Sequence, residues 1–103
     1  MKGKPDFTVL KGFIVFEGLD GAGTTTQSRI LSEKLQQDGQ PSILTCEPTD
    51  SFIGKAVRHV LQNREAVAQG TLARLFAADR NNHLYHPANG ITAHISSGEK
   101  VIC

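Results

Sequence analysis

Residues 13–25 read FIVFEGLDGAGTT, and this stretch decides the fold. It starts with a short apolar run, Phe13 to Phe16, that is rich in β-branched and aromatic residues. Such a run predicts a strand buried on both faces, as in a parallel sheet. From Thr24 the pattern becomes helical, and Gly39 followed by Pro41 predicts the end of that helix. The stretch therefore predicts a strand, a glycine-rich turn and a helix in succession.

The glycine-rich turn matches the phosphate-loop pattern G-x-x-x-x-G-K-[ST] at every defined position except the lysine, where Thr24 stands. Glycines let polyphosphate lie against bare backbone, and successive N–H groups then point at the anion. The following helix adds its free N–H groups and the positive end of its dipole. A turn without a ligand is the alternative, but the strand and helix on either side favour phosphate binding. The predicted phosphate-binding residues are Gly18, Leu19, Asp20, Gly21, Ala22, Gly23, Thr24 and Thr25.

Thr24 is the main departure from this pattern. The usual lysine bridges the β and γ phosphates, and losing one such contact costs ~10²–10³ in rate. Three accounts stay open: another cation fills the gap, turnover is slow, or the chain binds nucleotide without catalysis. Lys55 and Arg58 are the candidate cations near the mouth of the sheet. The hydroxyl of Thr25 is placed to bind Mg²⁺.

The rest of the chain continues an α/β pattern. Residues 42–46 and 100–103 read as further strands, parallel to the first, and Asp50 or Ser51 can cap the helix that follows the second strand. Because a strand is just starting where the sequence stops, we expect an incomplete domain: residues 1–11 a flexible lead-in, and residues 12–103 the N-terminal part of a P-loop kinase domain. The predicted inward-facing residues of the helices are Ile30, Leu31, Leu35, Ile53, Ala56, Val57, Val60, Leu61, Leu72, Leu75 and Phe76.

Composition restricts the partners and the compartment. The chain has 103 residues, and 11 Lys and Arg nearly balance 10 Asp and Glu, which argues against a nucleic-acid partner. It has no apolar run long enough to span a membrane and no secretory signal, so we expect a cytoplasmic protein. Cys46 and Cys103 are expected to be free thiols. The four histidines lack a third metal ligand at a diagnostic spacing, and we expect exposed helical histidines, not ligands.

Motifs in order along the chain resemble those of one family. Residues 13–23 with Thr25, Thr26 and Gln27 resemble the opening of thymidylate kinases. Residues 47–50, with 53–55 and Arg58, resemble the family's segment after its second strand, and residues 75–80 (LFAADR) its substrate helix. Residues 98–102 resemble the strand leading to the family's Asp-Arg pair. The resemblance covers about the N-terminal half of a typical member.

The resemblance implies a nucleoside monophosphate kinase fold, a parallel sheet flanked by helices, and a homodimer if full length. It implies transfer of a phosphoryl group from ATP to dTMP with Mg²⁺. Asp20 would be catalytic, between donor and acceptor, and Glu47 would line the acceptor-phosphate side, where Cys46 replaces the family's usual arginine. Phe76 would stack on thymine and Arg80 would hydrogen-bond the base. The residues agree, since Phe76 and Arg80 are one helical turn apart.

Two other functions stay open at this stage. Thr24 and Cys46 both remove positive charge, which is what a degenerate, non-catalytic nucleotide-binding module would show. A P-loop kinase with a different acceptor is the other alternative. The pairing of Phe76 with Arg80 argues against that second alternative, because an aromatic face and a planar donor can meet one base together.

Overall fold

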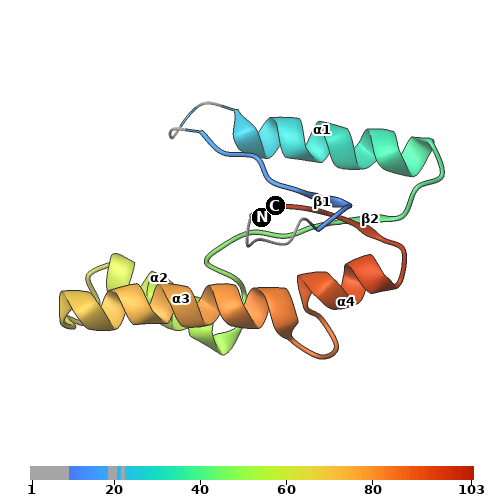
Figure 1. Cartoon of the computed structure of the whole chain (residues 1–103). Coiled ribbons are helices and arrows are strands. Elements are labelled where there is room, and N and C mark those ends of the chain that lie inside the picture. Colours follow the sequence, from blue (N-terminus) through green and yellow to red (C-terminus); the bar gives the residue numbers. More distant parts are fainter. Residues whose placement is uncertain (1–9, 19–20, 22) are drawn as a thin grey trace, which may run out of the picture.

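The computed structural model describes residues 10–18, 21 and 23–103, and in these residues three helices in succession separate the second strand from the last (Figure 1). The helices begin and end close to where the sequence predicts. Gly39, at φ +76°, follows the first helix as expected, and Ser51 caps the second by accepting a hydrogen bond from the Gly54 N–H at 3.2 Å. The elements in order are β1 (Phe13–Ile14), α1 (Thr24–Gln37), β2 (Ser42–Leu44), α2 (Phe52–Leu61), α3 (Gln69–Tyr85), α4 (Ile91–Ser96) and β3 (Lys100–Ile102).

The strands form a three-stranded parallel sheet in the order β1-β3-β2. Val101 is the register partner of both Phe13 and Ile43, so the last strand lies between the first two. Helix α1 covers one face of the sheet, and α2, α3 and α4 lie on the other (Figure 1). The prediction of a parallel sheet flanked by helices is confirmed, and the strand that the sequence shows last is the centre of that sheet.

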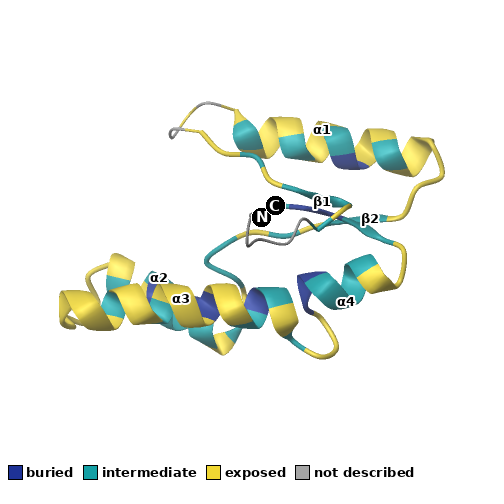
Figure 2. Ribbon diagram, viewed as in Figure 1, coloured by how far each residue is buried: buried dark blue, intermediate teal, exposed yellow. Residues whose placement is uncertain are grey.

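The core combines the central strand β3 with α2 and α4, which lie on the same face of the sheet (Figure 1). Val57, Ile91, Val101 and Ile102 are its fully buried apolar side chains (Figure 2). Among the residues predicted to face inward, Ile30 and Leu61 are wrong, because their side chains are about half exposed. Phe76 is also wrong as a core residue, at 41% exposed.

Helix geometry explains the error at Ile30. Residues two apart on a helix point about 200° away from each other, so Ile30 lies on the side of α1 opposite to the buried Ser32. Leu31, Ser32 and Leu35 cover the sheet instead, at the i, i+1 and i+4 positions of one face, and Ser32 is the buried member. The hydroxyl of Ser32 meets that of Ser42 on β2 at 3.3 Å. Helix α1 is therefore attached to the sheet partly through polar side chains.

Two further predictions concern a membrane span and the N-terminal lead-in. No helix in the residues that the structure describes has the length and apolar character needed to cross a membrane. The predicted lead-in, residues 1–11, falls largely outside the described residues and stays a prediction.

Candidate functional site

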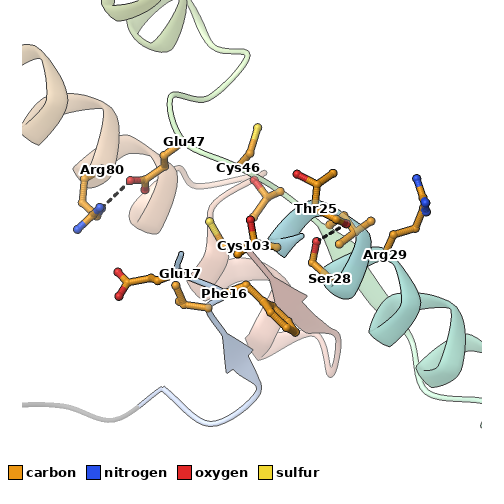
Figure 3. A pocket seen from close by; sticks show the side chains of 13 residues that line it. Phe16, Glu17, Thr25, Ser28, Arg29, Cys46, Glu47, Arg80 and Cys103 are labelled. Carbon is orange, nitrogen blue, oxygen red and sulfur yellow. Dashed lines mark hydrogen bonds and ion pairs between the residues drawn. The ribbon is translucent and has the colours of Figure 1, made fainter. Parts of the chain in front are cut away.

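A cavity of about 520 Å³ opens at the carboxyl ends of all three strands. Its walls come from residues 15–17 after β1, from residues 44–47 at the end of β2 and beyond it, and from Cys103 after β3. The start of α1 and Arg80 of α3 complete it. Figure 3 shows Thr25, Ser28 and Arg29 at one side of this cavity and Glu47 with Arg80 at the other. We call these the α1 side and the α3 side. The carboxyl edge of a parallel sheet is where ligands of α/β proteins bind.

On the α1 side, two described glycines have backbone conformations that favour glycine. Gly21 and Gly23 have φ angles of +81° and +85°, in the left-handed region that strongly favours glycine. The carbonyl of Gly23 accepts the N–H of Gln27 at 2.9 Å, so the N–H groups of Thr24 and Thr25 are at the open first turn of α1. Both threonines line the cavity. Leu19, Asp20 and Ala22 lie outside the described residues.

Charge near this side comes from different residues than the sequence suggested. Arg29 lines the cavity, one helical turn after Thr25. Arg58 instead binds the loop after β2: it donates to the carbonyl of Pro48 and to Asp50, and it lies 3.7 Å from Cys46 Sγ. Lys55 is not part of the cavity wall. Of the described cations, Arg29 and Arg80 are the ones that line this cavity.

The α3 side is a connected set of hydrogen bonds. The carboxylate of Glu47 accepts one bond from Arg80 Nε and one from His83 Nδ1, both at 2.7 Å. The other ring nitrogen of His83, Nε2, meets the hydroxyl of Thr45 at 2.6 Å. The hydrogen bond to Glu47, together with its negative charge, raises the pKa of Arg80. Arg80 is therefore held by Glu47, a residue of the loop that follows β2.

Phe76 and Arg80 share a second cavity of about 410 Å³ beside the first. Glu47, Asn81 and Leu84 also line it. This confirms that Phe76 and Arg80 lie on one face of α3, and the exposure of Phe76 leaves its ring open to that cavity. The arrangement offers a flat apolar surface next to a planar cationic donor, which suits a heterocyclic base.

Sequence reasoning missed Asp79, whose side chain is 1% exposed. Its carboxylate accepts the backbone N–H of Thr49 at 2.8 Å and the hydroxyl of Thr49 at 2.6 Å. Asp79 thus fixes the loop after β2, residues 45–51, against α3. Gly54 lets α2 pack directly against the same loop, because a Cβ at this position would lie 2.0 Å from the carbonyl oxygen of Thr49.

His83 was missed as well. The expectation of exposed histidines is wrong for this residue, which is buried because Glu47 and Thr45 satisfy both of its ring nitrogens. Its spacing carries a signal: Asp79 and His83 are at i and i+4, and Phe76 and Arg80 are at i and i+4 on a neighbouring strip of the same helix. Polar residues spaced by four on a helix that carries candidate site residues indicate a buried set of hydrogen bonds.

Cys46 and Cys103 are free thiols, as predicted, and both line the first cavity. Burial raises the pKa of the Cys103 thiol, and the charge of Glu47 adds to this. Cys46 is exposed. No group of three or more His, Cys, Asp or Glu side chains in the described part of the chain could hold a metal ion by itself.

Comparison with known proteins identifies the family. The family model described as thymidylate kinase matches residues 16–103. A Treponema pallidum protein named as a thymidylate kinase is 44% identical over 95 residues, which cover 92% of this chain and 45% of that protein. A Methanococcus vannielii protein with the same family name is 51% identical over 72 residues, covering 70% of this chain and 33% of its own length. A third, from Pyrococcus horikoshii, is 42% identical over 97 residues, covering 88% and 45%.

Two statements follow from the comparison. The chain spans less than half the length of these curated relatives, at 33–45%. The family match begins just after β1 and covers α1, β2, all of α3 and β3. The resemblance drawn from the sequence motifs is thereby confirmed, and the chain belongs to the thymidylate kinase family.

Proposed function

We propose that this chain forms part of the nucleotide site of a dTMP kinase, which transfers the γ-phosphoryl group of ATP to dTMP and gives dTDP. The observation that carries the proposal is the placement of Phe76 and Arg80 in a cavity beside the carboxyl edge of the sheet. In a member of the thymidylate kinase family, that pair suits the thymine base of the acceptor. The start of α1, across the edge of the sheet, suits the phosphates of the donor.

The chemistry asked of the protein is positioning and neutralisation of charge. In our proposal the backbone of residues 18–25 and the first turn of α1 hold the ATP phosphates. Arg29, on the cavity wall, adds positive charge at that side. Phe76 stacks on thymine, Arg80 donates to its carbonyl, and Glu47 keeps Arg80 in place. Asp20 is proposed as the catalytic residue between donor and acceptor.

Magnesium fits the α1 side. Mg²⁺ in such sites takes most of its ligands from phosphate oxygens and water, with one or two from the protein. The hydroxyl-bearing Thr25 lines the cavity at the start of α1, so it would hold the ion there, and a cluster of protein ligands is not required. The bound ion would neutralise charge on the transferring phosphoryl group. Action in the cytoplasm and as a homodimer are further proposals that follow from the family.

Calorimetric titration of the purified chain with Mg·ATP and, separately, with dTMP tests this proposal. Competition with other nucleoside monophosphates tests the acceptor, and a coupled assay for ADP release tests turnover. We expect both nucleotides to bind and dTMP to be preferred among the monophosphates. Binding without ADP release would favour the non-catalytic nucleotide-binding module. Absence of binding by a chain shown to be folded by circular dichroism would contradict the nucleotide site.

A further inference from the structure

A line of three hydrogen bonds runs from the end of β2 to the guanidinium of Arg80. Thr45 bonds His83 at 2.6 Å, His83 bonds Glu47 at 2.7 Å, and Glu47 bonds Arg80 at 2.7 Å. Burial decreases along this line: the side chain of His83 is 7% exposed, that of Glu47 20% and that of Arg80 69%. The line therefore connects the interior of the fold to a side chain at the mouth of the cavity.

The chemistry of the partners fixes the tautomer of His83. A carboxylate only accepts hydrogen bonds, so the ring nitrogen facing Glu47, Nδ1, carries the proton. In the neutral ring Nε2 then accepts the hydroxyl proton of Thr45. Both nitrogens are satisfied in this one orientation, and rotating the ring would break both bonds at a buried position. The ring is thus a rigid link between β2 and Glu47.

The same bonds set the orientation of Arg80. Its Nε–H is the group that binds Glu47, so the two terminal nitrogens extend beyond the carboxylate. Arg80 lines both cavities, and Phe76 lines the one beside it. An unrestrained arginine loses considerable rotamer freedom when it binds a ligand, and a preformed orientation removes part of that cost.

We propose that His83 is a positioning residue of this site: it holds Glu47, and through Glu47 the guanidinium of Arg80, in the orientation that receives the acceptor base. The proposal rests on the proposed function for the identity of the ligand. Its structural part, that Arg80 is oriented through His83, stands on the hydrogen bonds alone. His83 itself is separated from the cavities by Glu47, since it lines neither of them.

The chain provides a matched control. His94 also meets a glutamate through Nδ1, with Glu99 Oε1 at 2.9 Å, but this pair lies at the end of α4 and lines neither cavity. His94→Ala therefore removes a histidine–glutamate contact of the same kind away from the site. His83→Ala removes the link. His83→Asn keeps an amide donor near the position of Nδ1 and so can still bind Glu47.

The experiment uses ¹⁵N-labelled chain and two readouts. The ring ¹⁵N shifts of His83 report its tautomer, and the Arg80 Nε–H signal reports the bond to Glu47. Titration with dTMP then gives the affinity of each variant. We expect the Nδ1–H tautomer, a displaced Arg80 Nε–H signal in His83→Ala, and about tenfold weaker dTMP binding in that variant. His83→Asn should recover most of both effects, and His94→Ala should change neither.

Each result bears on a separate claim. An Arg80 signal and a dTMP affinity in His83→Ala equal to those of the parent chain would overturn the proposal, as would an equal loss in His94→Ala. If His83→Ala does not fold, His83→Asn decides: the proposal requires it to keep the Arg80 signal. Failure of the parent chain to bind dTMP while the Arg80 signal still follows His83 would reject the proposed function and leave the orienting role of His83 intact.

Discussion

The α1 and α3 sides of the cavity are built on different principles. On the α3 side, side chains from the loop after β2 and from α3 interlock through Glu47, Asp79 and His83, and two of the three are buried. On the α1 side, a ligand would meet mainly backbone groups. Among the described residues these belong to Gly21, Gly23 and the first turn of α1. Arg29 is exposed there and makes no ion pair with any described residue.

The difference follows from what each side is proposed to recognise. A base presents few polar atoms in fixed directions, so recognising it requires side chains held in one orientation. A polyphosphate presents charge in many directions, and N–H groups at a helix start suit it without specific side chains. The α3 side should therefore respond to changes that loosen its network, and the α1 side to changes of charge.

The largest effect is expected from restoring charge on the α1 side. Thr24→Lys places an ammonium group at the first residue of α1, on the cavity wall. We expect it to raise the rate of ADP release with dTMP by ~10²–10³, measured on this chain or a longer form that carries it. Thr26→Lys, two residues further along the same turn, controls for a general charge effect. An unchanged or lower rate would indicate that another cation, such as Arg29, already fills the role.

The next effect tests the rigidity of the α3 side. Gly54→Ala puts a methyl group within 2.0 Å of the Thr49 carbonyl, so the loop after β2 must move away from α2. We expect a loss of about 3 kcal/mol in the free energy of unfolding, measured by urea titration. Gly70→Ala is the matched control in α3, where the methyl group would meet only the flexible end of Arg74. We expect that variant to be more stable than the parent chain by at most about 1 kcal/mol. Equal losses of stability in the two variants would mean that the contact between Gly54 and the loop after β2 is no tighter than the surroundings of Gly70.

The third prediction separates the two sides of the cavity by the nucleotide that each is proposed to bind. Phe76→Ala removes the ring that faces the second cavity, and we expect dTMP binding to weaken by ~1–3 kcal/mol while Mg·ATP binding stays the same. Calorimetry with each nucleotide measures both. Because Phe76 is 41% exposed, the variant should fold. Unchanged dTMP affinity in a folded variant would exclude stacking on the base.

The smallest effect concerns the two thiols of the cavity wall. Cys46 is exposed, whereas Cys103 follows the central strand and burial raises its pKa. Alkylation requires access and the thiolate, so iodoacetamide should modify the half-buried Cys103 more slowly than the exposed Cys46 at neutral pH. Mass spectrometry of labelled peptides over time separates the two rates. Equal rates would show that the centre of the cavity is as open as its rim.

Much of the architecture is present in local sequence signals. The helix that starts at Thr24, the glycine after α1 and the cap at Ser51 each depend on a few neighbouring residues, and each lies where it was predicted. The strand predicted over residues 13–16 is confirmed only at Phe13–Ile14, and it is not buried on both faces, since Val15 is half exposed. The helical spacing of Phe76 and Arg80 is also local, and the structure places both in one cavity. These features follow from backbone preferences and periodicity, which act over one or two turns.

The sequence by itself therefore determined the order of elements, the parallel α/β class, the family and the pairing of Phe76 with Arg80. Only the tertiary structure decided that β3 lies between β1 and β2, that Asp79 and His83 are buried, and that Glu47 orients Arg80. The hydrogen bonds concerned join residues 28 to 38 positions apart in sequence, such as Thr45 with His83. A polar side chain is buried only where a partner satisfies it, and partners that distant are brought together by the fold and not by any local pattern.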